Sequence, residues 1–252
     1  MCTLLLAYRA HPQYRLVIAA NRDEYYLRPT HPAHFWEDAP HIFAGRDLVH
    51  GGTWLGVTAT GRIAALTNYR DPSDLHRHGP SSRGQLVSGF LAQEAGAEEY
   101  LARLRESGVP YGGYNLLVGD SERLFCYSNK NDRVLPIAPG IHGLSNHLLD
   151  TPWPKVRCGK DGLARILSRQ SLSAEELFAL LADQTHPPDQ ELPDTGVGLE
   201  LERMLSPIFI TSAQYGTRCS TVLLVDATGK ATFIERSFEG EVTTERQAQF
   251  QW

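Results

Sequence analysis

Four pairs of short strand-like segments, each pair joined by a tight turn, constrain the fold of this chain most strongly. The segments are rich in Leu, Val, Ile and Thr, and only a few turn-forming residues separate the two members of each pair. The pairs are 2–8 with 14–20, 53–58 with 62–67, 113–119 with 123–128, and 217–225 with 231–238. Because hairpins join neighbouring antiparallel strands, the chain is predicted to build antiparallel sheet.

Helical periodicity occurs in three stretches between these hairpins. Residues 82–106 begin with serine cap candidates, space large apolar residues on one face, and contain Gly96 as an expected break. Residues 155–167 and 173–182 follow, and Ser173 with Glu176 makes a capping box in the second. Strands first and last with helices between them predict an α+β fold in which helices stack on antiparallel sheets.

The rest of the chain gives no sign of a second domain. We therefore expect a single domain over residues 1–252. The segment 185–198, rich in Pro, Gly and Asp, is expected to be either a loop or a lid over a pocket.

Charge and hydropathy narrow the range of partners. A net charge of -5 disfavours nucleic acid and anionic membranes, which both select a basic surface. No stretch approaches the roughly 18 apolar residues of a membrane span. The first residues lack the basic region and the apolar length of a signal peptide. We therefore expect a cytoplasmic protein with a small-molecule substrate or ligand and no integral membrane segment; the sequence leaves the oligomeric state open.

The cysteine at position 2 differs from the other three in its place in the chain. Cys126, Cys158 and Cys219 form no CxxC pair or zinc spacing, and we expect them to be buried structural residues. If Met1 is removed, Cys2 carries a thiol and a free α-amine together, and the amine can act as base for its own side chain. The alternative is that position 2 is a cysteine without any catalytic meaning.

Polar residues at strand ends add candidate partners for this thiol. A hairpin brings the end of its second strand near the start of its first, so Asp23 is expected to lie close to Cys2 and to orient the amine. Asn68 and Asn146 each end a strand-like stretch, where an amide can donate to the oxyanion of an acyl transfer. Arg218 is expected to favour the thiolate through its fixed charge. Taken singly, each is equally well explained as a turn residue, a surface cation or part of a strand-end salt bridge.

Six short motifs give the chain a resemblance to a known family. They are residues 1–6 (MCTLLL), 21–24 (NRDE), 50–56 (HGGTWLG), 66–70 (LTNYR), 143–146 (GLSN) and 215–221 (YGTRCST). In this order they resemble the NRDE proteins, the group that includes the transport and Golgi organisation protein 2 family. The resemblance implies a four-layer αββα sandwich of the N-terminal-nucleophile (Ntn) hydrolase type, similar to choloylglycine hydrolases and penicillin V acylases.

The resemblance also assigns roles to single residues. It implies Cys2 as nucleophile, Asp23 as the group orienting its amine, Asn68 and Asn146 as oxyanion and substrate-positioning amides, and Arg218 as the arginine beside the thiol. One departure is Ala20, which stands where the acylases usually have another arginine. Strand alternation points Arg22 to the face opposite Asp23, so Arg22 is not a simple replacement.

Three further residues are predicted to contact the substrate. Asn21 shares a strand face with Asp23, and Gly52 and Trp54 are suited to walling a pocket, since glycine permits close backbone approach and Trp supplies an apolar face. The segment 51–54 is equally well explained as a tight entry into a strand.

Two classes of function remain open at this point. We expect a thiol amidohydrolase acting on a small amide or related acyl substrate, with no required cofactor. The alternative is a carrier or chaperone for haem, lipid or acyl-CoA that has kept the pocket and lost turnover, because the resemblance also implies links to membrane traffic, lipid metabolism and haem mobilisation. Haem finds weak support, because the chain has no CxxCH and the histidines, including His76 and His78, stand mostly in polar surroundings.

Overall fold

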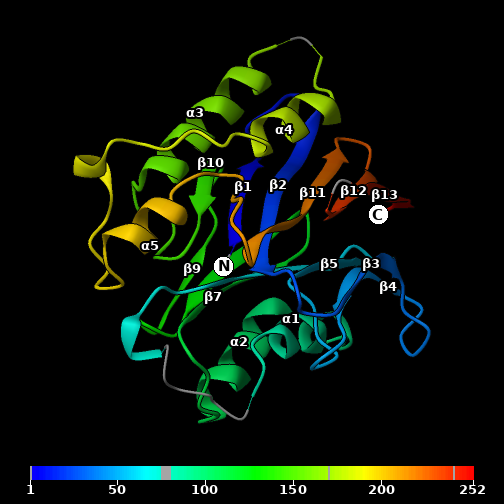
Figure 1. The fold of residues 1–252 in the computed structure, drawn as a ribbon. Helices are drawn as coiled ribbons and strands as arrows, with labels where there is room; N and C mark the ends of the chain where they lie inside the picture. Colours follow the sequence, from blue (N-terminus) through cyan, green and yellow to red (C-terminus); the bar gives the residue numbers. More distant parts are fainter. Residues whose placement is uncertain (1, 75–80, 170, 241) are drawn as a thin grey trace.

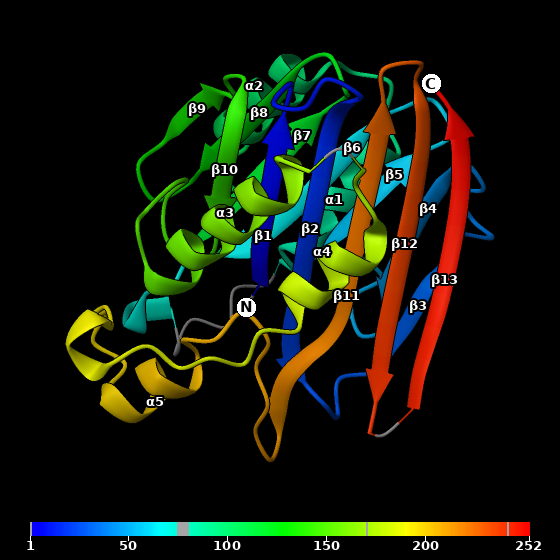
Figure 2. The same cartoon turned by 90° about the horizontal axis from the view of Figure 1, so that it is seen from above.

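Two antiparallel β-sheets lie face to face in the computed structural model, which describes residues 2–74, 81–169, 171–240 and 242–252 (Figures 1 and 2). In sheet A the strand order is β10-β1-β2-β11-β12-β13, and in sheet B it is β3-β4-β5-β6-β7-β8-β9. The strands of sheet A are β10 (Gly140–Leu144), β1 (Cys2–Tyr8), β2 (Tyr14–Tyr25), β11 (Tyr215–Asp226), β12 (Lys230–Glu239) and β13 (Val242–Gln251). Those of sheet B are β3 (Thr30–Phe35), β4 (Ile42–Asp47), β5 (Leu55–Thr58), β6 (Ile63–Asn68), β7 (Tyr114–Gly119), β8 (Leu124–Ser128) and β9 (Arg133–Pro136).

Helices cover the outer face of each sheet, which gives four layers in the order α, β, β, α (Figure 1). The helices α3 (Pro154–Leu167) and α4 (Ala174–Leu181) lie on sheet A, and α1 (Gly84–Leu91) and α2 (Ala97–Glu106) lie on sheet B. A shorter helix, α5 (Leu199–Met204), follows the segment 185–198. The predicted α+β class and the αββα sandwich are confirmed.

Three apolar layers separate the four layers of secondary structure. Leu4 and Ile18 face the opposite sheet, whereas Leu5 and Val17 on the same strands face α3 and α4. Both faces of β1 and β2 are therefore buried, which explains why these strands are continuous apolar runs. The start of β1 and the end of β2 lie at one end of the sandwich, where β2 becomes polar. The candidate site lies at this end.

The local signals in the sequence were correct in some places and wrong in others. All four predicted hairpins are present. Gly96 is the N-cap residue of α2, so the predicted break is confirmed. The Ser173 hydroxyl accepts from the Glu176 N–H at 3.2 Å, which is the serine half of the predicted capping box. The serine caps of α1 are wrong, since its N-cap is Arg83 and no side chain caps the helix.

Four strands were not predicted, and three of them are edge strands. The four are β3, β4, β9 and β13, whereas β10 corresponds to the predicted strand-like stretch that ends at Asn146. The strand β2 also continues to Tyr25, beyond the predicted end at residue 20. This extension matters for the site, because it holds residues 21–24 in a strand beside the start of β1.

Candidate active site

Cys2 lies at the end of sheet A, in a row of paired residues that crosses three strands. Its strand partner is Arg22 on β2, and Arg22 is in turn paired with Cys219 on β11. Strand alternation directs this row toward the space between the sheets. The buried Arg22 guanidinium lies 4.3 Å from the centre of the Trp54 ring, and it donates to the Thr30 hydroxyl at 3.3 Å. The thiol therefore has a fixed positive charge as its strand neighbour.

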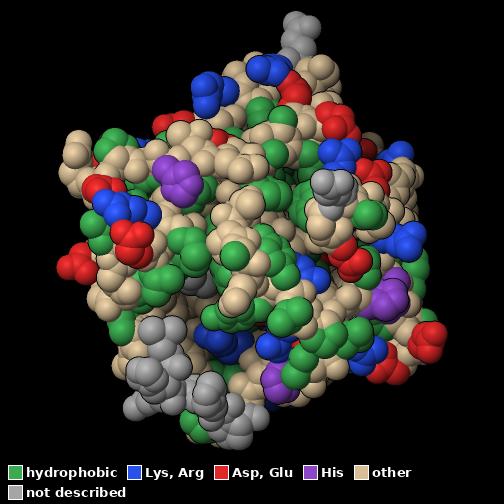
Figure 3. Space-filling view, viewed as in Figure 1, with side chains coloured by type: hydrophobic (Ala, Val, Ile, Leu, Met, Phe, Trp, Pro, Cys, Tyr) green, Lys and Arg blue, Asp and Glu red, His purple; other side chains and the backbone are tan. Residues whose placement is uncertain are grey.

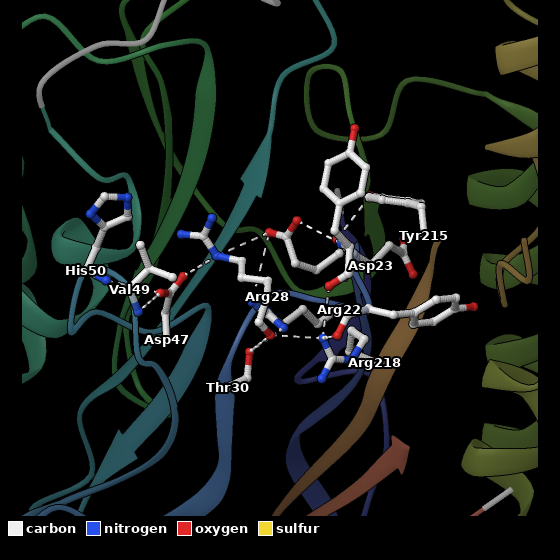
Figure 4. Close-up of polar contacts among 12 residues, drawn as sticks. Arg22, Asp23, Arg28, Thr30, Asp47, Val49, His50, Tyr215 and Arg218 are labelled. Atoms are coloured by element: carbon white, nitrogen blue, oxygen red, sulfur yellow. Dashed lines mark hydrogen bonds and ion pairs between the residues drawn. The ribbon is translucent and has the colours of Figure 1, made fainter. Parts of the chain in front are cut away.

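A β-bulge in β11 turns Arg218 away from this row. Thr217 pairs with Asp23 and Cys219 pairs with Arg22, so Arg218 is the extra residue between the two pairs. Its guanidinium donates to the backbone carbonyls of Tyr25, Tyr26 and Arg28 at 2.9–3.1 Å (Figure 4). The prediction that Arg218 lies beside the thiol is therefore wrong, and Arg22 is the arginine found there.

Asp23 lies one residue beyond Arg22 and faces the helical layer, as alternation predicts. The carboxyl is 1% exposed and accepts from the Thr217 hydroxyl at 2.8 Å, and the Tyr215 hydroxyl donates to its backbone carbonyl at 3.0 Å. Although Asp23 and Arg22 point to opposite faces, both line the pocket that contains Cys2, because the pocket opens at the end of the strands. The structure thus brings Asp23 and Cys2 to one place.

Burial dominates the electrostatics around the thiol. It raises the pKa of Cys2 above its ordinary value, and the charge on Arg22 opposes this only in part. Burial likewise raises the pKa of Asp23, against the charge of Lys155 and the hydrogen bond from Thr217. Lys155 on α3 is itself buried, which lowers its pKa to about 8, and its ammonium donates to the Leu205 carbonyl at 2.8 Å. Burial therefore works against the expected thiolate, because a raised pKa favours the protonated thiol.

The pocket around Cys2 is a cleft of about 320 Å³ between the ends of the two sheets. Its sheet A side consists of Cys2, Arg22, Asp23 and Glu24. The rest of the lining comes from the β3–β4 region, from sheet B and from the start of α1. Its residues are Arg28, Asp47, His50, Thr53, Trp54, Leu66, Asn68, Ser81, Ser82, Arg83, Gly84 and Gly112. Most of these side chains are charged or polar, so the cleft suits a small polar ligand better than a long apolar one.

The two asparagines have different positions relative to this cleft. Asn68 lines it from the end of β6 with a half-buried side chain. Asn146 is fully buried outside the described lining, and its amide donates to the Asn68 carbonyl at 3.0 Å. The Asn146 carbonyl groups accept from Arg70, whose backbone N–H is 2.7 Å away. Asn68 is thus placed to contact a ligand, and Asn146 is placed to hold Asn68.

Of the three predicted substrate contacts, Trp54 is in the described lining of the cleft, whereas Gly52 and Asn21 are not. Asn21 is buried, donates to the carbonyls of Leu181 and Ile208 at 2.8 and 2.9 Å, and accepts from the Ser220 hydroxyl at 2.6 Å. These bonds tie the helical layer to sheet A, so the substrate-binding prediction for Asn21 is wrong.

Trp54 forms part of the sheet B wall of the cleft, and Gly52 packs against Gly84, which lines the same wall. A Cβ atom at Gly52 would lie 2.4 Å from the backbone of Gly84, so only glycine allows the segment before β5 to meet the start of α1. Trp54 is nine-tenths buried, lines the cleft, and stacks against Arg22.

The mouth of the cleft carries an ion-pair cluster that the sequence did not reveal. Arg28 donates to Asp47 at 2.6 Å and lies 3.7 Å from Glu24, and Glu24 lies 3.9 Å from Arg22 (Figure 4). The Asp47 carboxylate also accepts from the N–H groups that follow it in the β4 turn, and hydrogen bonding to Arg28 and this turn lowers its pKa despite partial burial. Arg28, Lys155 and Arg83 carry no distinctive sequence spacing. Arg22 stands in the motif 21–24 at the polar end of β2, which was the one signal that pointed toward this region.

Two other expectations, on the three remaining cysteines and on the segment 185–198, agree with the structure in part. Cys126 and Cys219 are buried, with burial raising the pKa of Cys126 to about 12, but Cys158 is exposed on α3. The segment 185–198 contains a 3-10 turn, Asp189–Glu191, and none of its residues is among the described lining of the cleft. It is a loop beside α5 and does not form a wall of this pocket.

The described residues offer little for haem or a metal ion. The cleft has only two large apolar side chains in its described lining, Trp54 and Leu66, whereas haem needs broad apolar walls. His76 and His78 lie outside the described residues, as does Met1. Within the described parts of the chain, no group of three or more His, Cys, Asp or Glu residues is arranged to hold a metal, and no helix is long and apolar enough to span a membrane.

The described fold has counterparts among solved structures. The αββα sandwich is that of Ntn hydrolases, and two solved structures share it. The first is the Caenorhabditis elegans ortholog of N-acylethanolamine-hydrolyzing acid amidase, with a TM-score of 0.55, 12% identity, and coverage of 88% of this chain and 92% of that chain. The second is a mutant conjugated bile acid hydrolase from Clostridium perfringens, with a TM-score of 0.56, 8% identity, and coverage of 100% and 97%. At such identities the likeness concerns the fold alone.

The family follows from the sequence comparison. Residues 1–240 match the family Transport and Golgi organisation 2. The Transport and Golgi organization protein 2 homolog of Bos taurus is 37% identical to this chain, over 97% of the chain and 95% of its own length. The chain belongs to this family, as the NRDE resemblance implied.

Proposed function

We propose that the chain is an Ntn-type thiol amidohydrolase that acts on a small amide or related acyl substrate. The single observation that supports this most is the place of Cys2, at the wall of a cleft that also contains the buried Asp23 carboxyl and the Asn68 amide. The amidase and bile acid hydrolase with the same fold add support at the level of fold only.

The protonated state of the thiol sets the first step. Burial raises the pKa of Cys2, so the thiol must lose its proton as it attacks. Once Met1 is removed, the α-amine of Cys2 is bonded to the same residue and takes that proton. Asp23 orients the resulting ammonium, and Arg22 favours the negative charge on sulfur.

The acyl transfer then proceeds through the groups around the cleft. Sulfur attacks the substrate carbonyl, and the Asn68 amide donates to the oxyanion of the tetrahedral intermediate. The C–N bond breaks as the ammonium returns its proton to the leaving amine, which leaves a thioester on Cys2. A water molecule activated by the α-amine hydrolyses the thioester and restores the thiol. This chemistry uses only protein groups and no cofactor.

A matched pair of cysteine variants tests the proposal. Cys2→Ala still permits removal of Met1 and keeps the α-amine, but it removes the covalent route, so turnover of amides and thioesters should fall at least about 10³-fold. Cys158→Ala removes the exposed thiol on α3 and should leave turnover unchanged. Substrate binding to Cys2→Ala should remain close to that of the wild type.

Two results would count against the proposal. Hydrolysis that survives in Cys2→Ala would exclude Cys2 as nucleophile. No hydrolysis of any amide or thioester by the wild type, together with ligand binding that does not depend on Cys2, would favour the carrier alternative instead.

A further inference from the structure

Lys155 carries a buried charge that the proposed mechanism does not use. On the face of the molecule shown in Figure 3, Lys and Arg side chains lie at the surface, several of them beside Asp or Glu. Lys155, in contrast, is only 4% exposed. Burying an ammonium group costs free energy, and lysine is almost never fully buried unless its charge is compensated. A lysine in this position therefore needs a negative group nearby.

Neither its helix nor its hydrogen bond provides that negative charge. Lys155 is the second residue of α3, where the positive end of the helix dipole disfavours a cation. Its ammonium donates to the Leu205 carbonyl at 2.8 Å, which is a neutral acceptor. Within the described chain the ammonium forms no direct ion pair, so its charge acts on its neighbours through space. Such an action is effective in a buried layer, because the dielectric constant there is low.

A short segment after α5 connects Lys155 to Asp23. The segment begins with Leu205, the acceptor of Lys155. Further along it, the Ile210 N–H donates to the Thr217 hydroxyl at 2.9 Å, and this hydroxyl donates to Asp23 at 2.8 Å. The segment passes beside the start of β1 in both views of the fold (Figures 1 and 2). Lys155 and Asp23 thus lie in one buried region next to the thiol.

The other titratable groups of this region are matched or favour their neutral forms. Arg70 and Glu202 are in direct contact with each other, so their charges largely cancel at a distance. Burial raises the pKa of the Cys2 thiol, and it raises the pKa of the Tyr215 hydroxyl well above its ordinary value. On the opposite face of β2, Arg22 lies 3.9 Å from Glu24.

Lys155 and Asp23 are each the other's strongest charged neighbour. Burial lowers the pKa of Lys155 to about 8, and the charge of Asp23 opposes this more than any other charge does. Burial raises the pKa of Asp23, and the Lys155 ammonium is the charge that opposes this most. The α-amine of Cys2 must be unprotonated to accept the thiol proton, so before the attack it does not compensate Asp23. Lys155 is the cation placed to do so at that stage.

We propose that Lys155 is a positioning residue of the thiol site: its ammonium compensates Asp23 while the α-amine is neutral, so that the carboxylate is ready for the ammonium that forms. The transferred proton moves from sulfur to the α-amine and then to the leaving amine, and Lys155 keeps its own proton throughout. This inference rests on the proposed function for the proton transfer, but the effect of Lys155 on Asp23 is measurable without turnover.

Carbon-13 NMR of the aspartate carboxyls measures this effect in the untagged, full-length protein. The Asp23 signal is assigned by its loss in Asp23→Asn, and its position is followed against pH. A nearby opposite charge typically lowers a carboxyl pKa by about 1–3, so Lys155→Met should raise the pKa of Asp23 by about 1 or more. Lys160→Met is the matched control on the same helix, because Lys160 pairs with Asp150 at 2.6 Å and should leave Asp23 unaltered.

The reciprocal measurement keeps the test decisive if Lys155→Met does not fold. Because the coupling between two sites is mutual, Asp23→Asn should lower the pKa of Lys155 below its value of about 8 by a similar amount. The ε-carbon signal of Lys155, assigned by its loss in Lys155→Arg, reports this pKa.

A pH profile of turnover distinguishes positioning from a purely structural role. Asp23 acts as carboxylate, so its contribution is lost as the pH falls through its pKa. Raising that pKa in Lys155→Met should move the acidic limb of kcat/KM to higher pH, whereas Lys160→Met should leave the limb in place. A loss of stability alone would lower the amount of active protein without moving the limb.

The results separate this inference from the proposed function. An Asp23 pKa that is the same in the wild type and Lys155→Met, or a Lys155 pKa that does not fall in Asp23→Asn, overturns it even if amides are hydrolysed. An acidic limb that stays in place in Lys155→Met also overturns it. Values that move as expected support the pairing of Lys155 with Asp23 even if Cys2→Ala shows that the chain is not a hydrolase.

Discussion

Arg22 is the residue whose surroundings define this site most clearly. Its guanidinium is 5% exposed, stacks on Trp54 at 4.3 Å, and lies beside the thiol of its strand partner Cys2. A desolvated cation–π contact is worth about 2 kcal/mol, which helps to hold the charge in place. Arg22 therefore provides the fixed positive charge that the sequence had suggested for Arg218.

The two asparagines should respond differently to truncation. Asn68→Ala removes an amide at the cleft and should lower kcat by about 10²–10³ with little change in stability. Asn146→Ala leaves the Asn68 carbonyl without its amide donor and removes one side-chain acceptor of Arg70, so it should lower the free energy of unfolding by about 1–3 kcal/mol. Steady-state kinetics and urea unfolding of both variants check this. A larger kcat loss in Asn146→Ala, with unchanged stability, would transfer the oxyanion role to Asn146.

At the scale of elements, a buried ion pair joins α5 to the end of β6. Arg70 and Glu202 are each 4% exposed and are in direct contact, and the other Glu202 oxygen accepts from the backbone and hydroxyl of Thr195 at 2.9 and 2.5 Å. Because Arg70 also bonds to Asn146, this pair connects the loop 185–198 to the residue that holds Asn68.

Neutralising one member of this pair should be costly. Glu202→Gln leaves Arg70 buried without its counter-charge and should lower the free energy of unfolding by about 3–5 kcal/mol. Asp189→Asn is the matched control, since it breaks the exposed pair between Arg203 and Asp189 and should change the stability far less. Urea unfolding gives both values, and equal effects in the two variants would contradict the structural role of the buried pair.

The elements also show which parts of the fold the sequence could predict. The hairpins were predictable because each strand carries an apolar run, and β1 and β2 are buried on both faces. The strand β13 was not, because it is an edge strand with mainly exposed polar residues. The bulge at Arg218 was not predictable either, because no residue type marks it. One extra residue between Thr217 and Cys219 moves every later side chain of β11 to the opposite face of the sheet.

At the scale of the whole molecule, the cleft exists because two sheets end at the same place. Sheet A brings Cys2 and Asp23 together, and sheet B with α1 supplies Asn68, Trp54 and Arg83. Most of these cleft residues were predicted from the polar strand ends and from the family resemblance. A hairpin is enough to bring Cys2 and Asp23 together, and the end of a strand is enough to place Asn68. The side of the cleft formed by the start of α1 depends on contacts between segments that are distant in the sequence. For example, the Thr53 N–H donates to the Gly84 carbonyl at 3.2 Å, and no local sequence pattern indicates such a contact.

The central claim is that Cys2 acts as an N-terminal nucleophile whose own α-amine is the base. Intact-mass measurement of the untagged protein tests it most directly, because that amine exists only after Met1 has been removed. We predict that nearly all molecules lack Met1 and that a single acyl or alkyl adduct formed in the cleft maps to Cys2. Retention of Met1 in most of the active protein would contradict the account.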